Sequence, residues 1–256
     1  MLKNIGERIA EEMENSIARK ILHELEKEPI ENSLLIFDMI DEKPERVEVY
    51  TLDPKNILML WKGFKTPDAS IRAESKENVE KLLKFVDDVE CSFTVPLELS
   101  KPLEKYKMNK EDWLFYTTDK KGFSSQIKHK VERLRPEPEY VEQISSEWPY
   151  FNSSDFIAEK MLQHPFFGIK ERCELVSYAG GIAGTDKTLF LALAHTKENF
   201  RGRGMMKSIT SALTEEAFRQ KKVPTMYIVK GNQPSINSVE KLGFYSITTH
   251  VKFTPK

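Results

Sequence analysis

The residues whose types and spacing could do chemistry lie between Leu189 and Phe244. An Arg-Gly-Arg-Gly turn, residues 201–204, separates an apolar run from a predicted helix. Glycines allow the backbone to turn tightly and to approach a ligand closely. The first N–H groups of a helix attract an anion, and Arg201 and Arg203 could add charge-assisted hydrogen bonds. The turn therefore predicts an anion site of the size of a pyrophosphate.

Taken alone, the turn could equally be a basic loop before an ordinary helix. Two further motifs follow it at a defined spacing: Asn232-Gln-Pro-Ser235 and Glu240-Lys-Leu-Gly-Phe244. Together the three motifs resemble the GCN5-related N-acetyltransferase superfamily, in which Arg/Gln-x-x-Gly-x-Gly/Ala follows the fourth strand. Arg201 and Gly204 match that pattern, whereas Met206 replaces its last small residue. We expect the Met206 side chain to point away from the ligand.

The resemblance implies that acetyl-CoA or another acyl-CoA binds as co-substrate in a gap between splayed fourth and fifth strands. Backbone groups of residues 194–196 would bind the pantetheine arm and polarise the thioester carbonyl, a role that needs no particular side chain. No metal is expected, because the histidines have no ligand spacing. The coenzyme-binding residues that the resemblance implies are Ala194, His195, Thr196, Arg201, Gly202, Arg203, Gly204, Met205, Met206 and Asn232.

Within the superfamily, the chain is most similar to the glycine N-acyltransferase-like group. Leu175 to Tyr178 resembles that group's third strand, and Val239 stands where many relatives have a tyrosine acid. Phe190 stands where glycine-acylating relatives have a glutamate base. His195 is the nearest titratable residue and is the predicted general base, since imidazole suits that role. The alternative is a histidine at a strand end with no catalytic role.

The predicted function is acyl-CoA-dependent N-acyl transfer to the amine of a small molecule, with glycine or another amino acid as the acceptor. Direct attack within one ternary complex would supply much of the rate. Two alternatives stay open. The chain could acetylate protein lysines or N-termini, or it could be an acyl-CoA-binding module without catalysis.

The second half alternates between strands and helices, which predicts a mixed, partly parallel α/β (α+β) sheet flanked by helices. The apolar residues of the 201–219 helix recur at helical spacing, and those at 189–195 form a buried-strand pattern. The predicted strands are 131–134, 167–170, 174–178, 189–195, 225–229 and 245–253, and the predicted helices are 138–148, 154–163, 201–219 and 235–242.

The first half mixes elements and shows no catalytic constellation. Strands are predicted at 33–40, 47–51, 56–61 and 113–118, with an apolar stretch at 91–99 interrupted by a proline. Ser75 is predicted to cap a helix over 76–86. A polar, turn-like stretch places the domain boundary near residue 130, giving domains of 1–130 and 131–256. By resemblance these are two tandem acetyltransferase-like halves, of which the second is intact and the first could be a substrate domain.

Composition fits a folded protein with no special partner class. The 256 residues are 39% hydrophobic and 31% charged, with a net charge of −1. This balance predicts neither a nucleic-acid nor a membrane partner, and two cysteines favour a reducing compartment. The helical spacing of Ile5, Ile9, Met13, Ile17 and Ile21, with Leu22, predicts an amphipathic helix at the N-terminus. Residues 1–28 are rich in glutamate, which argues against a transit peptide. We therefore expect a cytoplasmic location; the family resemblance leaves a mitochondrial one open, and the oligomeric state is open too.

Overall fold

The computed structural model describes residues 17–87, 89–151 and 153–256. These residues form two compact units, which are described separately. Unit 1 comprises residues up to Asp112 together with Thr249–Lys256, and unit 2 comprises Trp113–Thr248. The division differs from the predicted boundary near residue 130. It falls earlier because the strand Asn109–Thr117 spans both units, and the final strand returns to the first unit.

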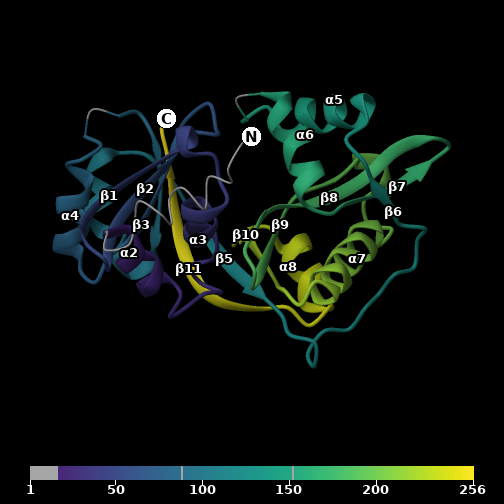
Figure 1. Cartoon of the computed structure of the whole chain (residues 1–256). Helices are drawn as coiled ribbons and strands as arrows, with labels where there is room; N and C mark the ends of the chain where they lie inside the picture. The colour runs from purple at the N-terminus through teal and green to yellow at the C-terminus, as the bar shows by residue number, and fades with distance from the viewer. Residues whose placement is uncertain (1–16, 88, 152) are drawn as a thin grey trace, which may run out of the picture. The chain divides into compact units, whose positions relative to one another are not determined.

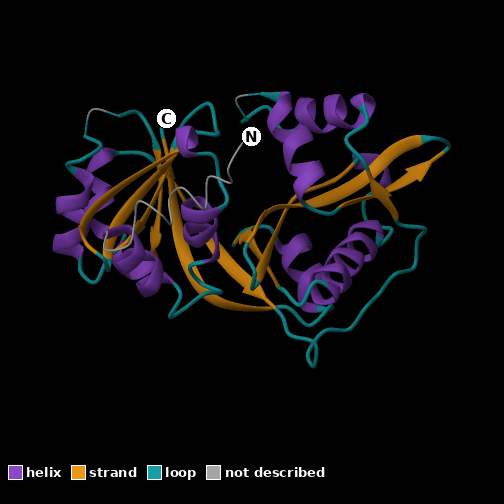
Figure 2. Cartoon of the chain, in the orientation of Figure 1, coloured by secondary structure: helices purple, strands orange, loops and turns teal. Residues whose placement is uncertain are grey.

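Unit 1 is built around the strand order β1-β2-β3-β4-β11, in which β11 is the final strand, Tyr245–Thr254. Among the described residues of this unit, β3 and β4 are the one parallel pair, and helix α4 connects them. The elements in this unit are α2 (Ile17–Leu25), α3 (Ser33–Ile40), η1 (Pro44–Arg46), β1 (Val47–Asp53), β2 (Asn56–Trp61), β3 (Asp68–Arg72), α4 (Lys76–Leu83), β4 (Ser92–Pro96), η2 (Leu97–Leu99) and η3 (Lys101–Tyr106). Figures 1 and 2 show the helices against both faces of this part of the sheet.

The alternation along β2 explains why this strand is buried on both faces. Ile57 and Met59 pack with residues of α2 and α3. Leu58 and Leu60 pack on the other face with residues of α4. A strand covered on both sides reads as a continuous apolar run, as this one does.

The prediction of a strand over residues 33–40 was wrong, because these residues form helix α3. A short apolar run does not distinguish a buried strand from a buried helix. As a helix, the segment places Ile36 in a cluster with Ile21 and Leu25 of α2. Residues Ile5, Ile9 and Met13 of the predicted N-terminal helix lie outside the described residues, and the part from Ile17 to Leu25 is confirmed.

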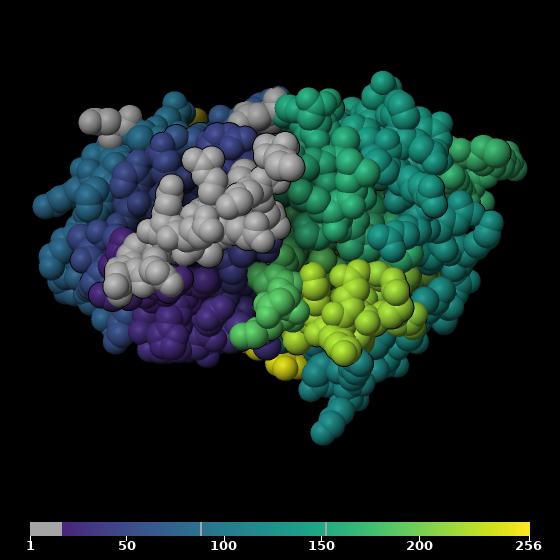
Figure 3. All heavy atoms as spheres, in the orientation of Figure 1, coloured from purple at the N-terminus to yellow at the C-terminus, as the bar shows by residue number. Residues whose placement is uncertain are grey.

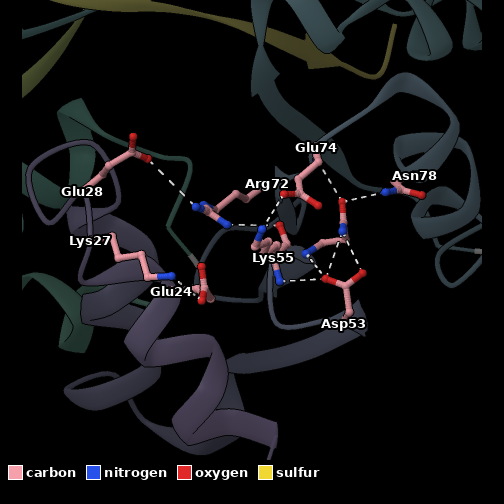
Figure 4. Close-up of polar contacts among 9 residues, drawn as sticks. Glu24, Lys27, Glu28, Asp53, Lys55, Arg72, Glu74 and Asn78 are labelled. Atoms are coloured by element: carbon pink, nitrogen blue, oxygen red, sulfur yellow. Dashed lines mark hydrogen bonds and ion pairs between the residues drawn. The ribbon is translucent and has the colours of Figure 1, made fainter.

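Polar contacts tie the β1–β2 turn to the start of α4 (Figure 4). Asp53 accepts hydrogen bonds from the backbone N–H groups of Lys55 (2.8 Å) and Asn56 (3.1 Å). The buried Asn56 Oδ1 in turn accepts from the Glu74 N–H (2.8 Å) and from Asn78 Nδ2 (2.9 Å). These contacts satisfy the buried amide, so we assign this cluster a structural role.

Unit 2 has the strand order β5-β10-β9-β8-β7-β6. In the part of it that the structure describes, β10 and β9 are parallel and the other neighbours are antiparallel. Figure 1 shows α5 and α6 on one face of these strands and α7 and α8 on the other. The elements are β5 (Asn109–Thr117), β6 (Glu132–Leu134), α5 (Pro138–Glu147), α6 (Ser154–Gln163), β7 (Phe166–Glu171), β8 (Glu174–Gly184), β9 (Thr188–Thr196), η4 (Glu198–Phe200), α7 (Met205–Arg219), β10 (Val223–Val229), α8 (Gln233–Glu240) and β11 (Tyr245–Thr254). The predicted mixed, partly parallel sheet flanked by helices is confirmed.

A long loop after β5 runs along α7 and α8. The N–H groups of Gln126 and Lys128 donate to Ser211 Oγ and Ser208 Oγ of α7, each at 3.0 Å. Gly243 lies against this loop with a φ of +88°, and a Cβ built on it would lie 2.0 Å from the Gly122 carbonyl oxygen. The Lys-Leu-Gly-Phe motif therefore needs its glycine for a close backbone approach.

Candidate functional site

Strands β9 and β10 pair over only three residues each and then separate. The pairs are Val223 with Thr188, Pro224 with Leu189, and Thr225 with Phe190. Both strands continue beyond that point, to Thr196 and Val229 respectively. Across its other edge, β10 stays paired with β5 as far as Val229. The separation therefore opens only on the side of β9, between the two parallel strands.

Backbone N–H and C=O groups alternate in direction along β9, and this alternation shows which of them face the opening. The Lys197 N–H donates to the Val176 carbonyl of β8 at 2.9 Å. In an antiparallel pair, alternate residues direct their N–H and C=O groups to opposite edges. Thr196, one residue before Lys197, therefore directs its groups away from β8, toward the gap, whereas residues 193 and 194 lie in a bulge of the β8–β9 pair. Leu193 has a φ of +54°, which marks this irregular point of the strand.

The backbone of the turn before α7, residues 201–204, is accessible. Gly202 and Gly204 have φ values of +77° and +80°, a conformation that favours glycine. A Cβ at either position would meet no atom within 4 Å. Gly204 caps α7, and Ser208 is the first residue whose N–H donates back to it, at 3.2 Å. The first N–H groups of α7 thus lack an intrahelical acceptor, and Figure 3 shows atoms of α7, in yellow-green, at the surface of this unit.

The methionines after Gly204 turn inward. Met205 is buried in the core of unit 2, and the partly buried Met206 packs against the same core. The bulkier residue at the end of the Arg-x-x-Gly-x-Gly/Ala pattern is therefore accommodated on the protein side. The cradle formed by the glycines and the helix start fits a phosphate-bearing group.

The arginines and a histidine brace this turn. Arg201 donates from Nε to the Thr196 carbonyl (3.0 Å), and Arg203 donates from Nη2 to the Asn199 carbonyl (2.8 Å). The Arg203 guanidinium also lies 5.0 Å from the centroid of the Phe200 ring. His129 Nε2 lies 2.8 Å from the Arg203 carbonyl oxygen, and since a carbonyl can only accept, Nε2–H is the donor. Sequence reasoning expected the arginines to contact an anion and did not foresee these contacts.

Asn232 lies where α8 begins. Its side-chain Oδ1 accepts a hydrogen bond from the Ser235 N–H at 3.3 Å, so it is the N-cap of the helix. This contact gives Asn232 a structural role at the end of β10. Its role as a coenzyme contact stays a prediction.

His195 lies on the separated part of β9, and its side chain contacts residues from two neighbouring elements. Its ring stacks on that of Tyr178 of β8, with centroids 5.7 Å apart and planes at 22°. Its Nε2 lies 3.6 Å from Oε2 of Glu147, at the C-terminus of α5. The His195 side chain is 28% exposed, and that of Glu147 is 20% exposed. The predicted base is thus accessible and faces a carboxylate.

The Glu147 carboxylate is held from both sides. Tyr178 donates its hydroxyl to Oε2 at 2.6 Å, and Gln143 donates from Nε2 to Oε1 at 3.1 Å. Trp148 Nε1–H donates to the Tyr178 oxygen at 3.1 Å, which directs the hydroxyl proton to Glu147. Burial, followed by the hydrogen bond to Glu147, strongly raises the pKa of Tyr178. Tyr178 is therefore a neutral donor at physiological pH.

Sequence reasoning missed Glu147, although a signal for it was present. The helix over 138–148 was predicted correctly. Its apolar face carries Tyr140 and Ile144, which are buried. Gln143 and Glu147 follow at the same helical spacing, so both polar residues lie on the face directed at the sheet. A carboxylate on the inner face of a helix is a candidate for a specific partner.

Two neighbouring positions of β9 supply no base. Phe190, which stands where glycine-acylating relatives have a glutamate, lies against the Tyr227 ring, with the centroids 5.8 Å apart. Thr188 is buried, and its hydroxyl pairs with Thr185 at 2.9 Å. Within the described residues, no group of three or more His, Cys, Asp or Glu side chains is arranged to hold a metal ion.

Comparison with known proteins finds a family model that covers the same region of the chain. A family model described as FR47-like protein matches residues 166–253, from β7 almost to the end of β11. The match therefore includes the gap, the turn and the start of α7. None of the curated proteins compared with this chain matches it significantly.

Solved structures match most of the chain. A GCN5-related N-acetyltransferase from Kribbella flavida has a TM-score of 0.67 at 14% identity, covering 94% of this chain and 96% of that one. A GCN5-related N-acetyltransferase-like protein from Streptococcus suis has a TM-score of 0.59 at 15% identity, covering 93% and 99%. A tandem GNAT protein from the clavulanic acid biosynthesis pathway has a TM-score of 0.56 at 9% identity, covering 94% and 95%.

These likenesses establish the fold of the chain. Unit 2 has the mixed sheet with separated parallel strands, and the chain as a whole has the fold of the GCN5-related N-acetyltransferases. The tandem neighbour fits the predicted layout of two halves. Among the helices that the structure describes, none is both long and apolar enough to cross a membrane.

Proposed function

We propose that this chain is an acyl-CoA-dependent N-acyltransferase, with the coenzyme in the gap between β9 and β10. The separation of these strands next to the accessible start of α7 is the observation that carries the proposal. The gap offers backbone groups that β9 and β10 do not pair with each other, although the Thr196 carbonyl already accepts a hydrogen bond from Arg201. The start of α7 offers N–H groups for a diphosphate. The FR47-like match over residues 166–253 supports the same assignment.

The proposed binding residues follow the order of the coenzyme's parts. The diphosphate lies against residues 202–206, where the glycines leave room and the helix dipole favours negative charge. The pantetheine arm extends the sheet along Ala194 and Thr196. Bound acyl-CoA supplies an activated acyl group to an attacking amine. Arg201 and Arg203 contribute positive charge while bracing the turn, and Asn232 lies at the far side of the gap.

The proposed acceptor is the amine of a small molecule, with glycine or another amino acid as the first candidates. His195 is the proposed general base, because it is accessible and lies on the separated part of β9. The similarity to the glycine N-acyltransferase-like group supports this acceptor class and rests on the third-strand pattern and on the absence of the usual tyrosine.

Thiol release tests the proposal. The purified chain is incubated with acetyl-CoA, benzoyl-CoA or a longer acyl-CoA and a panel of amino acids, amines and short peptides, and free thiol is measured. We expect release that depends on a small amine. Release only with peptides would favour a protein acceptor, and coenzyme binding without any release would favour a binding module. Absence of both binding and release would overturn the proposed function.

A further inference from the structure

We propose that Glu147 is a positioning residue for His195 and that the two residues work as a carboxylate–imidazole pair in amine activation. The inference rests on the proposed function, since it concerns the base of that reaction. Its basis is the geometry around the two side chains, which come from different elements, α5 and β9.

The carboxylate is fixed before any ligand arrives. Its Oε2 accepts from Tyr178 at 2.6 Å, and its Oε1 accepts from Gln143 at 3.1 Å. Gln143 also donates to the Leu175 carbonyl at 3.0 Å, which anchors α5 to β8. A carboxylate with two donors in place is pre-organised, and its Oε2 lies 3.6 Å from Nε2 of the imidazole. The carboxylate lies beside an accessible histidine, which a purely structural role on α5 does not explain.

The imidazole is also held in place. Stacking on Tyr178 sets its plane, and the 3.6 Å separation from Glu147 directs Nε2 toward the carboxylate. A carboxylate only accepts, so a neutral imidazole that closes this distance to a hydrogen bond would carry its proton on Nε2 and keep a lone pair on Nδ1. Glu147 and Tyr178 are the titratable groups that the structure places against His195, from α5 and β8 respectively.

The chemical step balances without a further reactant. The acceptor arrives as an ammonium ion and transfers one proton to Nδ1 of His195. This leaves an imidazolium, whose charge the Glu147 carboxylate offsets. The freed nitrogen lone pair attacks the thioester carbonyl carbon, so that a C–N bond forms and the C–S bond breaks. The coenzyme leaves as a thiolate and takes up the second proton of the attacking nitrogen, which gives an amide and the free thiol. The imidazolium returns the proton to water at the end of the cycle. Glu147 touches neither reactant and acts only through His195.

The decisive variant is Glu147→Gln, which keeps the size of the side chain and removes its charge. We expect kcat to fall about ten- to hundred-fold, less than the loss of a general base itself. The Kd for acetyl-CoA should be unchanged, because the backbone binds the coenzyme. His195→Ala should lower kcat more, and adding Glu147→Gln to it should cause no further loss. Glu142→Gln is the matched control, since Glu142 is an exposed acid on the same helix.

A spectroscopic readout tests the pair without the reaction. The ring-nitrogen NMR signals of His195 are recorded on the protein without coenzyme, at a pH where the ring is neutral. We expect them to move in Glu147→Gln and to stay in place in Glu142→Gln. If Glu147→Gln does not fold, Tyr178→Phe replaces it. That variant keeps the stacked ring, removes one donor to the carboxylate and should give a smaller fall in kcat.

The outcomes separate this inference from the proposed function. Wild-type kcat in Glu147→Gln, additive losses in the double variant, or unmoved His195 signals would each overturn the pair while leaving acyl transfer intact. Failure of the wild-type chain to bind acyl-CoA would overturn the proposed function and this inference with it.

Discussion

At the scale of single residues, the candidate coenzyme site depends on the absence of a side chain at Gly202 and Gly204. Their positive φ values and open Cβ positions leave backbone N–H groups exposed at the start of α7. The arginines beside them already bond to carbonyls of the same turn. The proposed binding of an anion therefore rests more on the backbone than the sequence pattern suggested, and the arginines hold the turn in shape.

Two substitutions at Gly204 distinguish the effect of backbone strain at this residue from the effect of electrostatic repulsion between its side chain and the proposed diphosphate. Gly204→Ala adds a small side chain at a φ of +80°, which costs roughly 1–2 kcal/mol of backbone strain. Gly204→Glu adds similar strain and also a negative charge beside the proposed diphosphate, and like-charge contacts cost several kcal/mol. We expect Gly204→Glu to raise the Kd for acetyl-CoA at least about hundred-fold, since 1.4 kcal/mol is tenfold.

Calorimetric titration of both variants measures the difference, and thermal unfolding checks that each is folded. Gly204→Ala should bind the coenzyme with a Kd within about tenfold of the wild-type value, from the strain alone. Equal affinities in Gly204→Glu and the wild-type chain would place the anion site elsewhere.

The turn at residues 201–204 could be predicted from its sequence because glycine spacing before a helix is a local signal. The partners of its side chains could not be predicted in the same way. His129 and Arg203 meet because the loop after β5 runs along α7. Glu147 and His195 meet because α5 packs on the strands next to β9. Such contacts follow from the tertiary fold and leave no short-range pattern.

At the scale of elements, periodicity and capping residues predicted most helices and strands of the chain. The helix from Lys76 was predicted from Ser75 and from the spacing of its apolar residues, and Ser75 does cap it. Strand β3 was missed because its five residues include Asp68 and Arg72 at the ends and offer little apolar alternation. Its pairing with β2 and β4 makes it a strand, which only the assembled sheet could reveal.

The cap of α4 gives a prediction at this scale. Ser75 Oγ accepts a hydrogen bond from the Asn78 N–H at 3.2 Å. Ser75→Ala removes this acceptor, so the free energy of unfolding of unit 1 should fall by about 1 kcal/mol. Ser75→Asp keeps a capping oxygen and should stay within about 0.5 kcal/mol of the wild-type value. Urea unfolding followed by circular dichroism measures both. An unchanged stability in Ser75→Ala would show that the cap contributes nothing.

At the scale of the whole molecule, the chain leaves unit 1, forms unit 2 and then returns to unit 1. Residues 249–256 belong to unit 1, where β11 pairs with β4 from His250 to Phe253. The sequence could not reveal this return, because the paired strands are far apart along the chain. The predicted boundary near residue 130 relied on a polar loop, and that loop lies within unit 2, against α7.

The returning strand carries a group that should make stability depend on pH. Burial lowers the pKa of His250 to about 4, and the opposing effect of Glu98 is smaller. The unfolded chain, with a histidine pKa of about 6.5, therefore binds more protons than the folded chain between these values. The contribution of His250 to stability is complete above pH 6.5 and is lost as the pH falls toward 4. The total loss is about 3 kcal/mol.

Chemical unfolding at pH 7, 5.5 and 4 measures this dependence. His250→Gln cannot be protonated, so the fall in the free energy of unfolding should be smaller by about 3 kcal/mol in this variant. His23→Gln is the control, because His23 is exposed, and it should follow the wild-type curve. If His250→Gln and the wild-type chain lose the same stability, the imidazole is not a source of the pH dependence.

The central claim is that the gap between β9 and β10, with the start of α7, binds an acyl-coenzyme A. Calorimetric titration of the purified full chain with acetyl-CoA tests it most directly, because it requires no knowledge of the acceptor. We predict saturable binding at one site per chain, with free coenzyme A competing for the same site. A folded chain that gives no binding at millimolar acetyl-CoA would contradict the claim.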